Sequence, residues 1–223
     1  MTTRQEEISA ALFHVQEEIA PYSPTLIVVT KTYPVSDVEI LASLGVNNFG
    51  ENRNEEGLEK SPIVAGKWHF QGEIQGKKIR SILSWADCLH SLDSLDHAKK
   101  ISRALTEDAG SEVGRSIELF LQLSLDGNPS RGGIIEGELL QSAEAISALA
   151  GITLLGIMCV PPVEMEPALA FSKVAAIHQE FKESFPNSPS LSAGMSQDYL
   201  LALQNGATHI RVGSKILGKR THP

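Results

Sequence analysis

Lys31 is the residue in this sequence whose type and position point most clearly to chemistry. It directly follows the apolar segment TLIVVT at residues 25–30, which has the β-branched character of a strand covered on both faces. Lys31 is therefore predicted at the carboxyl end of a strand, where α/β proteins bind their ligands. A lysine shielded from water has a lowered pKa, and its neutral amine can form a Schiff base. A lysine whose ammonium group extends from the strand end to solvent is an equally compatible interpretation.

A second group of residues, near the C-terminus, is suited to binding phosphate. The segments SAGMS at residues 192–196 and RVGS at residues 211–214 each end a predicted strand. Gly213 allows a close approach of the backbone to an anion, while Ser196 and Ser214 add hydroxyl groups. Taken singly, Ser196 is also a typical helix N-cap and Gly213 a typical tight turn. Two such loops after the last two strands of an α/β fold favour a phosphate site.

Arg211 lies two residues before Gly213 and so faces the same side of its strand. If Gly213 faces the mouth of a barrel, Arg211 faces the interior, where a cation needs an acceptor. One alternative is therefore a structural ion pair with a carboxylate such as Glu51. His69 in a strand is more often a satisfied core residue than a ligand, and Met158 is most simply a core residue.

The elements that would position these residues alternate between short apolar strands and amphipathic helices. Strands are predicted near residues 25–30, 47–50, 68–72, 88–91, 117–125, 154–159, 190–194 and 208–213. Helices are predicted near 4–19, 35–44, 51–60, 76–86, 94–108, 136–149, 165–185 and 197–205, with a capping box at Ser36 and Glu39. Eight strands with helices between them favour a single (β/α)₈ TIM barrel over residues 1–223 with an extra N-terminal helix. A doubly wound open sheet is the alternative.

The charge and the cysteine content of the chain limit which partners and which compartment are expected. The net charge of −8 argues against binding nucleic acid through its phosphates and against docking to an anionic membrane. The charged run at residues 51–60 predicts a solvated helix face. Cys88 and Cys159 form no C-x-x-C pair and lie in apolar runs, so we expect free buried thiols and a reducing compartment. No segment resembles a signal peptide or a membrane span, and the cytoplasm is the expected location.

Seven motifs spread over nearly the whole chain resemble the YggS/PROSC-type pyridoxal phosphate homeostasis proteins. They are VTKTYP at 29–34, FGEN at 49–52, WHFQG at 68–72, HSLDS at 90–94, LGIM at 155–158, LSAGMS at 191–196 and RVGS at 211–214. Each motif alone is weak evidence, whereas seven in order are specific. Tyr33, Gln71 and Ser214 depart from the usual family pattern, and serine in the last position keeps the hydroxyl group.

The resemblance implies a barrel of the alanine-racemase N-terminal type that binds pyridoxal 5'-phosphate (PLP) as an aldimine of Lys31. It implies that Arg211 faces the pyridine nitrogen and that no residue is catalytic or holds a metal. The segments implied to bind the phosphate contain Ser196, Gly213 and Ser214. The other residues implied to line the pocket are Asn52, His69, Met158 and Ser192.

The expected function is therefore intracellular PLP homeostasis, with the cofactor held and delivered to apo-PLP enzymes by a non-enzymatic, monomeric protein. An alternative is a PLP-dependent amino-acid racemase, which needs acid–base groups on both faces of the substrate. Lys31 would serve one face, and we expect no second domain in this chain to serve the other. A weaker alternative is an aldolase in which Lys31 forms a Schiff base with a sugar phosphate.

Overall fold

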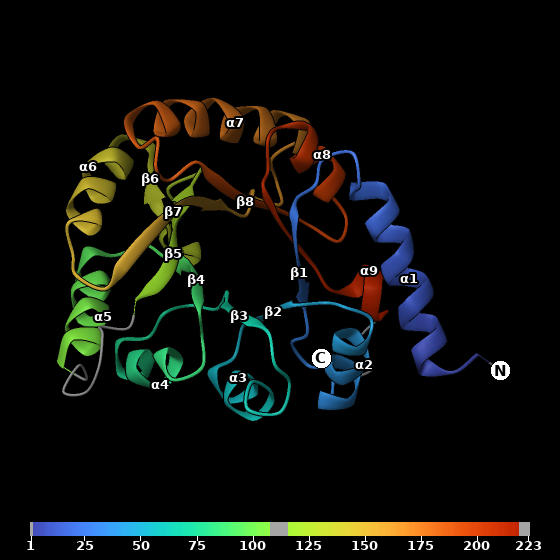
Figure 1. Ribbon diagram of the computed structural model, residues 1–223. Helices are drawn as coiled ribbons and strands as arrows, with labels where there is room; N and C mark the ends of the chain where they lie inside the picture. The colour runs from blue at the N-terminus through green and yellow to red at the C-terminus, as the bar shows by residue number, and fades with distance from the viewer. Residues whose placement is uncertain (1, 108–115, 219–223) are drawn as a thin grey trace.

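Eight parallel strands close into a barrel within the residues that the computed structural model describes, 2–107 and 116–218 (Figure 1). Around the barrel each strand pairs with the next one named, and the last pairs with the first. These strands are β1 (Thr25–Val29), β2 (Asn48–Glu51), β3 (Lys67–Phe70), β4 (Cys88–Leu92), β5 (Ile117–Ser124), β7 (Ile152–Cys159), β8 (Ser190–Met195) and β9 (His209–Val212). The two-residue strand β6 (Ile134–Ile135) pairs with the end of β5. The predicted (β/α)₈ barrel is confirmed.

Helices cover the outside of the barrel and join its strands, as Figure 1 shows. They are α1 (Arg4–Ile19), α2 (Val35–Ser43), α3 (Asn54–Lys60), α4 (Ile79–Leu83), α5 (Leu95–Glu107), α6 (Glu136–Ser147), α7 (Pro167–Ser184), α8 (Tyr199–Gln204) and α9 (Ser214–Leu217). Short 3₁₀ turns lie at Gly76–Lys78 (η1) and Pro129–Arg131 (η2). Over the described ranges, none of these helices combines the length and the apolar character needed to cross a bilayer.

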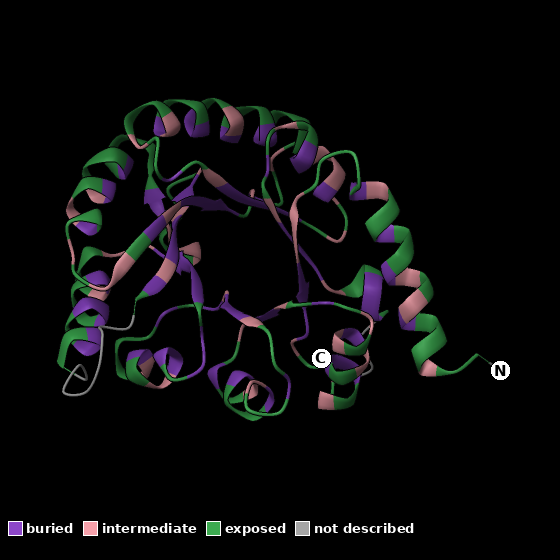
Figure 2. Cartoon of the chain, in the orientation of Figure 1, coloured by how far each residue is buried: buried purple, intermediate pink, exposed green. Residues whose placement is uncertain are grey.

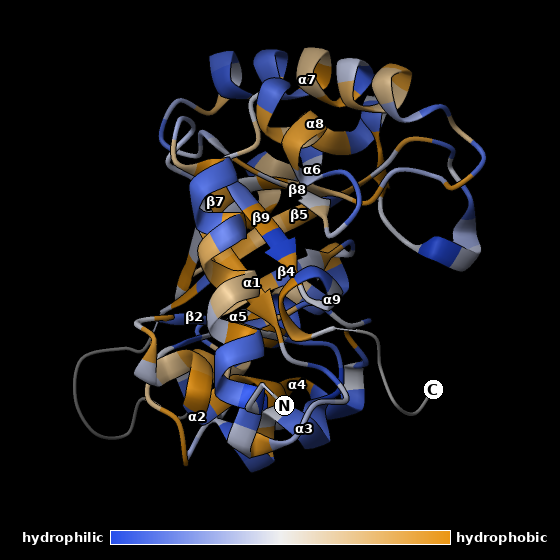
Figure 3. Ribbon diagram, turned by 90° about the vertical axis from the view of Figure 1, so that its right-hand side faces the viewer, coloured by the Kyte–Doolittle hydropathy of each residue, from blue (hydrophilic) through white to orange (hydrophobic). Residues whose placement is uncertain are grey.

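The core forms where the inner faces of the helices meet the strands. On α7, Phe171, Val174 and Phe181 are buried at helical spacing against the sheet. In Figure 2 the strands are mostly buried, whereas the helices carry both buried and exposed segments, and in Figure 3 the helices likewise carry both hydrophilic and hydrophobic segments. In β1, Val28 pairs with Phe49 on one side and Val212 on the other, so the predicted buried strand lies between two neighbours. This places the turn that follows β1 at the carboxyl-end rim of the barrel.

Two local predictions about helix starts are wrong. The predicted capping box at Ser36 is absent because α2 already begins at Val35, with Pro34 in extended conformation as its N-cap and no side-chain cap bond. The helix predicted over 51–60 begins only at Asn54, because Glu51 is the last residue of β2. The extra helix predicted at 4–19 is present, and it carries the capping box that the sequence reading missed, Thr3 with Glu6.

Candidate functional site at the mouth of the barrel

Lys31 lies in the turn after β1 and lines a cavity of about 300 Å³ at the carboxyl ends of the strands. The side chain is neither buried nor fully exposed. Its neighbour Thr30 is fully buried, and the backbone N–H of Thr30 donates to the Gly50 carbonyl of β2 at 2.9 Å. The apolar strand thus ends as the sequence predicts, with its lysine at the barrel mouth and facing a cavity.

The loops after β8 and β9 converge on one wall of this cavity. The Ser196 hydroxyl accepts hydrogen bonds from the backbone N–H of Gly213 at 3.1 Å and of Lys215 at 3.4 Å. Ser196 is therefore not the N-cap of α8, a position that Asp198 occupies. Gly213 lies so close to β1 that a Cβ atom on it would come within 2.9 Å of the Val29 carbonyl oxygen. Hydroxyl and backbone donors thus meet at the point predicted for a phosphate.

Arg211 lies beneath these loops and is 4% exposed. Its Nη1 atom donates to the carbonyl oxygen of Ser192 at 2.8 Å and to the hydroxyl of Ser192 at 2.6 Å, and Nη2 donates to the Cys159 carbonyl at 3.1 Å. The alternative of an ion pair with Glu51 is wrong, because Arg211 donates to the oxygen atoms of Ser192 and Cys159, whereas Glu51 pairs with Lys60 at 2.8 Å. Burial lowers the pKa of Arg211 to about 10, so the guanidinium is still a cation at neutral pH.

A chain of hydrogen bonds runs from Arg211 across the barrel interior. The Ser192 hydroxyl lies 2.9 Å from His90 Nδ1, His90 Nε2 lies 2.9 Å from His69 Nδ1, and His69 Nε2 lies 3.0 Å from the Asn48 side-chain oxygen. A guanidinium only donates, and a carbonyl oxygen only accepts. The Asn48 oxygen therefore accepts from His69 Nε2–H, His69 Nδ1 accepts from His90 Nε2–H, and His90 Nδ1 accepts from the Ser192 hydroxyl. In this arrangement both rings are neutral and carry their proton on Nε2.

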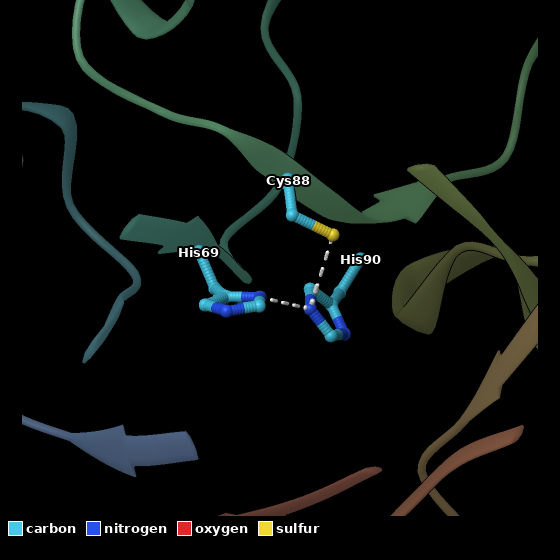
Figure 4. A group of neighbouring side chains, drawn as sticks. All are labelled: His69, Cys88 and His90. Carbon is cyan, nitrogen blue, oxygen red and sulfur yellow. Dashed lines mark hydrogen bonds between the residues drawn. The ribbon is translucent and has the colours of Figure 1, made fainter. Parts of the chain in front are cut away.

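The two histidines and Cys88 lie close enough together to resemble a metal site (Figure 4). Their ligand atoms lie within 4.8 Å of one another, and all three residues are buried. The facing ring nitrogens, however, are at hydrogen-bonding distance from each other, and burial raises the pKa of the Cys88 thiol, which disfavours the thiolate that metals prefer. Burial also lowers the pKa of His69 to about 3 and that of His90 well below its usual value. The cluster is therefore a neutral hydrogen-bonded network under Arg211.

Seven of the nine predicted site residues line the 300 Å³ cavity: Lys31, Asn52, Met158, Ser196, Arg211, Gly213 and Ser214. His69 and Ser192 do not line it; they lie below it, in the chain that reaches Arg211. Tyr33, a departure from the family pattern, donates from its hydroxyl to the Gly218 carbonyl at 2.6 Å.

Gln71 is a lining residue that the sequence reading did not select. It borders this cavity and a second one of about 460 Å³, and the two cavities also share Asn52, Met158 and Val160. The Gln71 amide nitrogen is buried and has no hydrogen-bond partner among the described residues. A buried donor without a partner is costly, so this amide is suited to meet an acceptor atom of a ligand.

Comparison with known proteins gives consistent matches over nearly the full chain. The family model for the alanine racemase N-terminal domain matches residues 6–221. A pyridoxal phosphate homeostasis protein of Corynebacterium glutamicum is 41% identical over 201 residues, which are 89% of this chain and 91% of the relative. The structure of PipY from Synechococcus elongatus PCC7942 with PLP bound is similar with a TM-score of 0.84 at 29% identity, covering 95% of this chain and 100% of that one. An alanine racemase of Corynebacterium glutamicum, at 15% identity and a TM-score of 0.74, shares the fold over 95% of this chain and 60% of its own.

Proposed function

The chain belongs to the family of alanine racemase N-terminal domains and, within it, to the pyridoxal phosphate homeostasis proteins, and from this membership we propose that it binds PLP and takes part in PLP homeostasis. The observation that carries the proposal is the meeting of three kinds of group in one cavity. These are the amine of Lys31, the buried guanidinium of Arg211, and the hydroxyl and backbone donors around Ser196 and Gly213.

The residues fit this cofactor. A cavity of about 300 Å³ lies at the lower end of the range of roughly 300–1,000 Å³ usual for small-molecule sites. In our proposal Ser196, Gly213 and Ser214 would hold the phosphate, and the Lys31 amine would condense with the aldehyde carbon, whose oxygen leaves as water. Asn52 and Met158 line the pocket. The unpartnered amide of Gln71 supports the presence of a ligand acceptor at its side of the cavity.

Arg211 would set the electronic state of the cofactor. When bound, PLP supplies an aldehyde that reacts reversibly with amines and a ring that withdraws electrons. A guanidinium keeps its own proton and donates it as a hydrogen bond, so the ring nitrogen stays uncharged. An uncharged pyridine stabilises negative charge on a neighbouring carbon less well than a protonated one. This arrangement supports a protein that holds and releases the cofactor, and it disfavours an enzyme that transforms an amino acid.

The same residues bear on the racemase alternative. Among the described residues that line the cavity, the titratable ones are Lys31, Asp198 and Arg211. Asp198 accepts a hydrogen bond from the Met195 backbone N–H at 2.6 Å, in a loop at the rim. Two-base racemisation requires proton-transfer groups on both faces of the substrate carbon. We therefore propose a non-enzymatic role. Measurable exchange of the α-proton of alanine would instead favour the racemase.

The proposal extends to the cellular setting. The chain, as one PLP-binding barrel over residues 1–223, would act as a monomer in the cytoplasm and pass PLP to apo-PLP enzymes. Cys88 and Cys159 are both free and buried, which agrees with a reducing compartment. Size-exclusion chromatography with light scattering tests the monomer, and reactivation of an apoenzyme by the loaded protein tests the transfer.

The direct test of PLP binding is an absorbance spectrum of the purified protein saturated with PLP, recorded before and after borohydride reduction. We expect a visible band that reduction removes, and peptide mapping should then find the reduced label on Lys31. An aldolase that uses Lys31 for a sugar phosphate would remain colourless under these conditions. A protein that takes up no PLP at saturation contradicts the proposal.

The phosphate assignment makes a separate prediction. Ser196→Ala should weaken PLP binding by at least about tenfold, because a hydrogen bond to a charged group contributes roughly 1.5–3 kcal/mol. Pyridoxal, which lacks the phosphate, should bind the variant and the wild type equally well. Ser190→Ala, at the opposite end of β8, is the matched control and should leave both ligands unaffected. Titration of each variant with both ligands measures the difference, and equal PLP affinity in Ser196→Ala would mean that the phosphate lies elsewhere.

A further inference from the structure

The turn that carries Lys31 is held by two charged residues of the neighbouring helix α3, of which Lys60 is buried and Glu56 is partly exposed. Lys60, the last residue of α3, is 2% exposed although it belongs to the charged run that predicts a solvated helix face. Its ammonium group donates to the Thr30 carbonyl at 2.9 Å, to Glu51 Oε1 at 2.8 Å and to Glu56 Oε2 at 2.8 Å. All three donors of the ammonium group are thus used, and one of them fixes the residue immediately before Lys31.

Glu56 holds the residue immediately after Lys31. Its Oε2 atom accepts a hydrogen bond from the Thr32 backbone N–H at 2.6 Å. Thr32 has a φ angle of +70°, in the left-handed region that a β-branched residue rarely adopts. A conformation of this kind persists only where surrounding contacts impose it. Glu56 therefore supports a strained backbone at the position next to the reactive lysine.

Glu51 completes the network from β2. It is fully buried, and its Oε1 atom also accepts from the Thr30 hydroxyl at 2.5 Å. Burial raises the pKa of Glu51 to about 7, because the loss of water outweighs the attraction of Lys60. A buried ion pair is a poor means of adding stability, since apolar residues of similar size usually serve at least as well. The network is thus better explained by what it positions than by the stability it adds.

We propose that Lys60 and Glu56, together with Glu51, are positioning residues that fix the turn 30–32 and so place the Lys31 amine in the cofactor cavity. Lys60 acts on the carbonyl before Lys31, and Glu56 acts on the amide after it. The inference concerns the placement of Lys31 and rests on the proposed PLP function for its significance. It goes beyond that function by assigning a role to three side chains that do not line the cavity.

Amide hydrogen exchange on the cofactor-free protein tests the placement without any cofactor. In Glu56→Ala, exchange in the segment around Thr32 should become at least about tenfold faster, because the amide loses its acceptor and the strained turn opens. Glu56→Gln keeps an acceptor oxygen and should restore most of the protection. Glu59→Ala, an exposed position on the same helix, is the matched control and should exchange like the wild type.

PLP binding to the same variants gives the second readout. We expect Glu56→Ala to bind PLP about tenfold more weakly, with slower borohydride trapping on Lys31, because a displaced amine reacts less readily. Lys60→Met should act in the same direction, and if it fails to fold, the Glu56 variants still decide the matter. Wild-type exchange at Thr32 together with wild-type trapping in Glu56→Ala would overturn the inference. If the wild type takes up no PLP, the proposed function fails, while the exchange data still judge the positioning role.

Discussion

Lys31→Ala is expected to abolish the covalent attachment of PLP completely. The variant should show no visible band that borohydride removes, and peptide mapping should find no reduced label in the segment after β1. The physical reason is that the Lys31 amine lines the cavity, whereas the loops proposed to hold the phosphate, and Arg211, would make only non-covalent contacts with the cofactor. Weak retention of PLP through those contacts should therefore survive, at an affinity reduced by roughly a hundredfold or more, which corresponds to about 2.7 kcal/mol.

Two further lysines make this experiment decisive. Lys99 is exposed on α5 and lines neither cavity, so Lys99→Ala should keep the full band and the label. Lys215 follows Ser214, is exposed, and has an ammonium group that pairs with Glu18 at 3.2 Å. A reduced label that persists in Lys31→Ala and maps to Lys215 would move the site of attachment. Loss of the band in Lys99→Ala would show that the spectrum reports something other than the cavity.

The position of the site was predictable because it depends on periodicity and topology. An apolar β-branched run that ends in a lysine specifies a strand end, and the carboxyl ends of parallel strands meet at one rim. For the same reason Ser196 and Gly213, which are distant from Lys31 in sequence, were expected near it, and they line the same cavity. Local patterns of this kind carry the fold and most of the cavity lining.

The interior partners of Arg211 were not predictable in the same way. His90 and Ser192 are 102 residues apart in sequence, and they meet because side chains of β4 and β8, two strands that do not pair with each other, both point into the barrel interior. Strand alternation shows only that each side chain faces the interior, whereas the partner depends on strand tilt and register. The prediction that Lys60 lies on a solvated helix face was wrong for a different reason. The spacing of Glu56 and Lys60 suits a surface ion pair, and the burial of Lys60 follows from how α3 packs over the end of β2.

The buried histidines predict a steep loss of stability in mild acid. Burial lowers the pKa of His69 to about 3 and that of His209 to about 4, and it lowers the pKa of His90 well below its usual value. In the unfolded chain a histidine titrates near pH 6.5. Below that pH the unfolded chain takes up protons that the folded protein excludes, so the stability present above pH 6.5 is lost as the pH falls toward 4. Glu51 opposes this trend, because its raised pKa of about 7 lets the folded protein bind one proton first.

The number of protons that the histidines take up on unfolding, less the one that Glu51 releases, sets how steeply the free energy of unfolding depends on pH. Burial also lowers the pKa of His178, so with His69, His90 and His209 on one side and Glu51 on the other the uptake on unfolding near pH 5 is at least about two protons, or roughly 2.7 kcal/mol per pH unit. Urea unfolding of the cofactor-free protein at pH 7, 6 and 5 measures this slope. His209→Asn should lower the slope by about one proton, because it removes one histidine that titrates only in the unfolded chain. His209 is suited to this substitution because it is half-buried and takes no part in the hydrogen-bond chain to Arg211. The slope should persist in high salt, since ions screen surface charges far more than buried ones. A free energy of unfolding that stays constant from pH 7 to 5 would mean that the histidine network accepts protons while folded, and the one-directional chain to Arg211 would then be wrong.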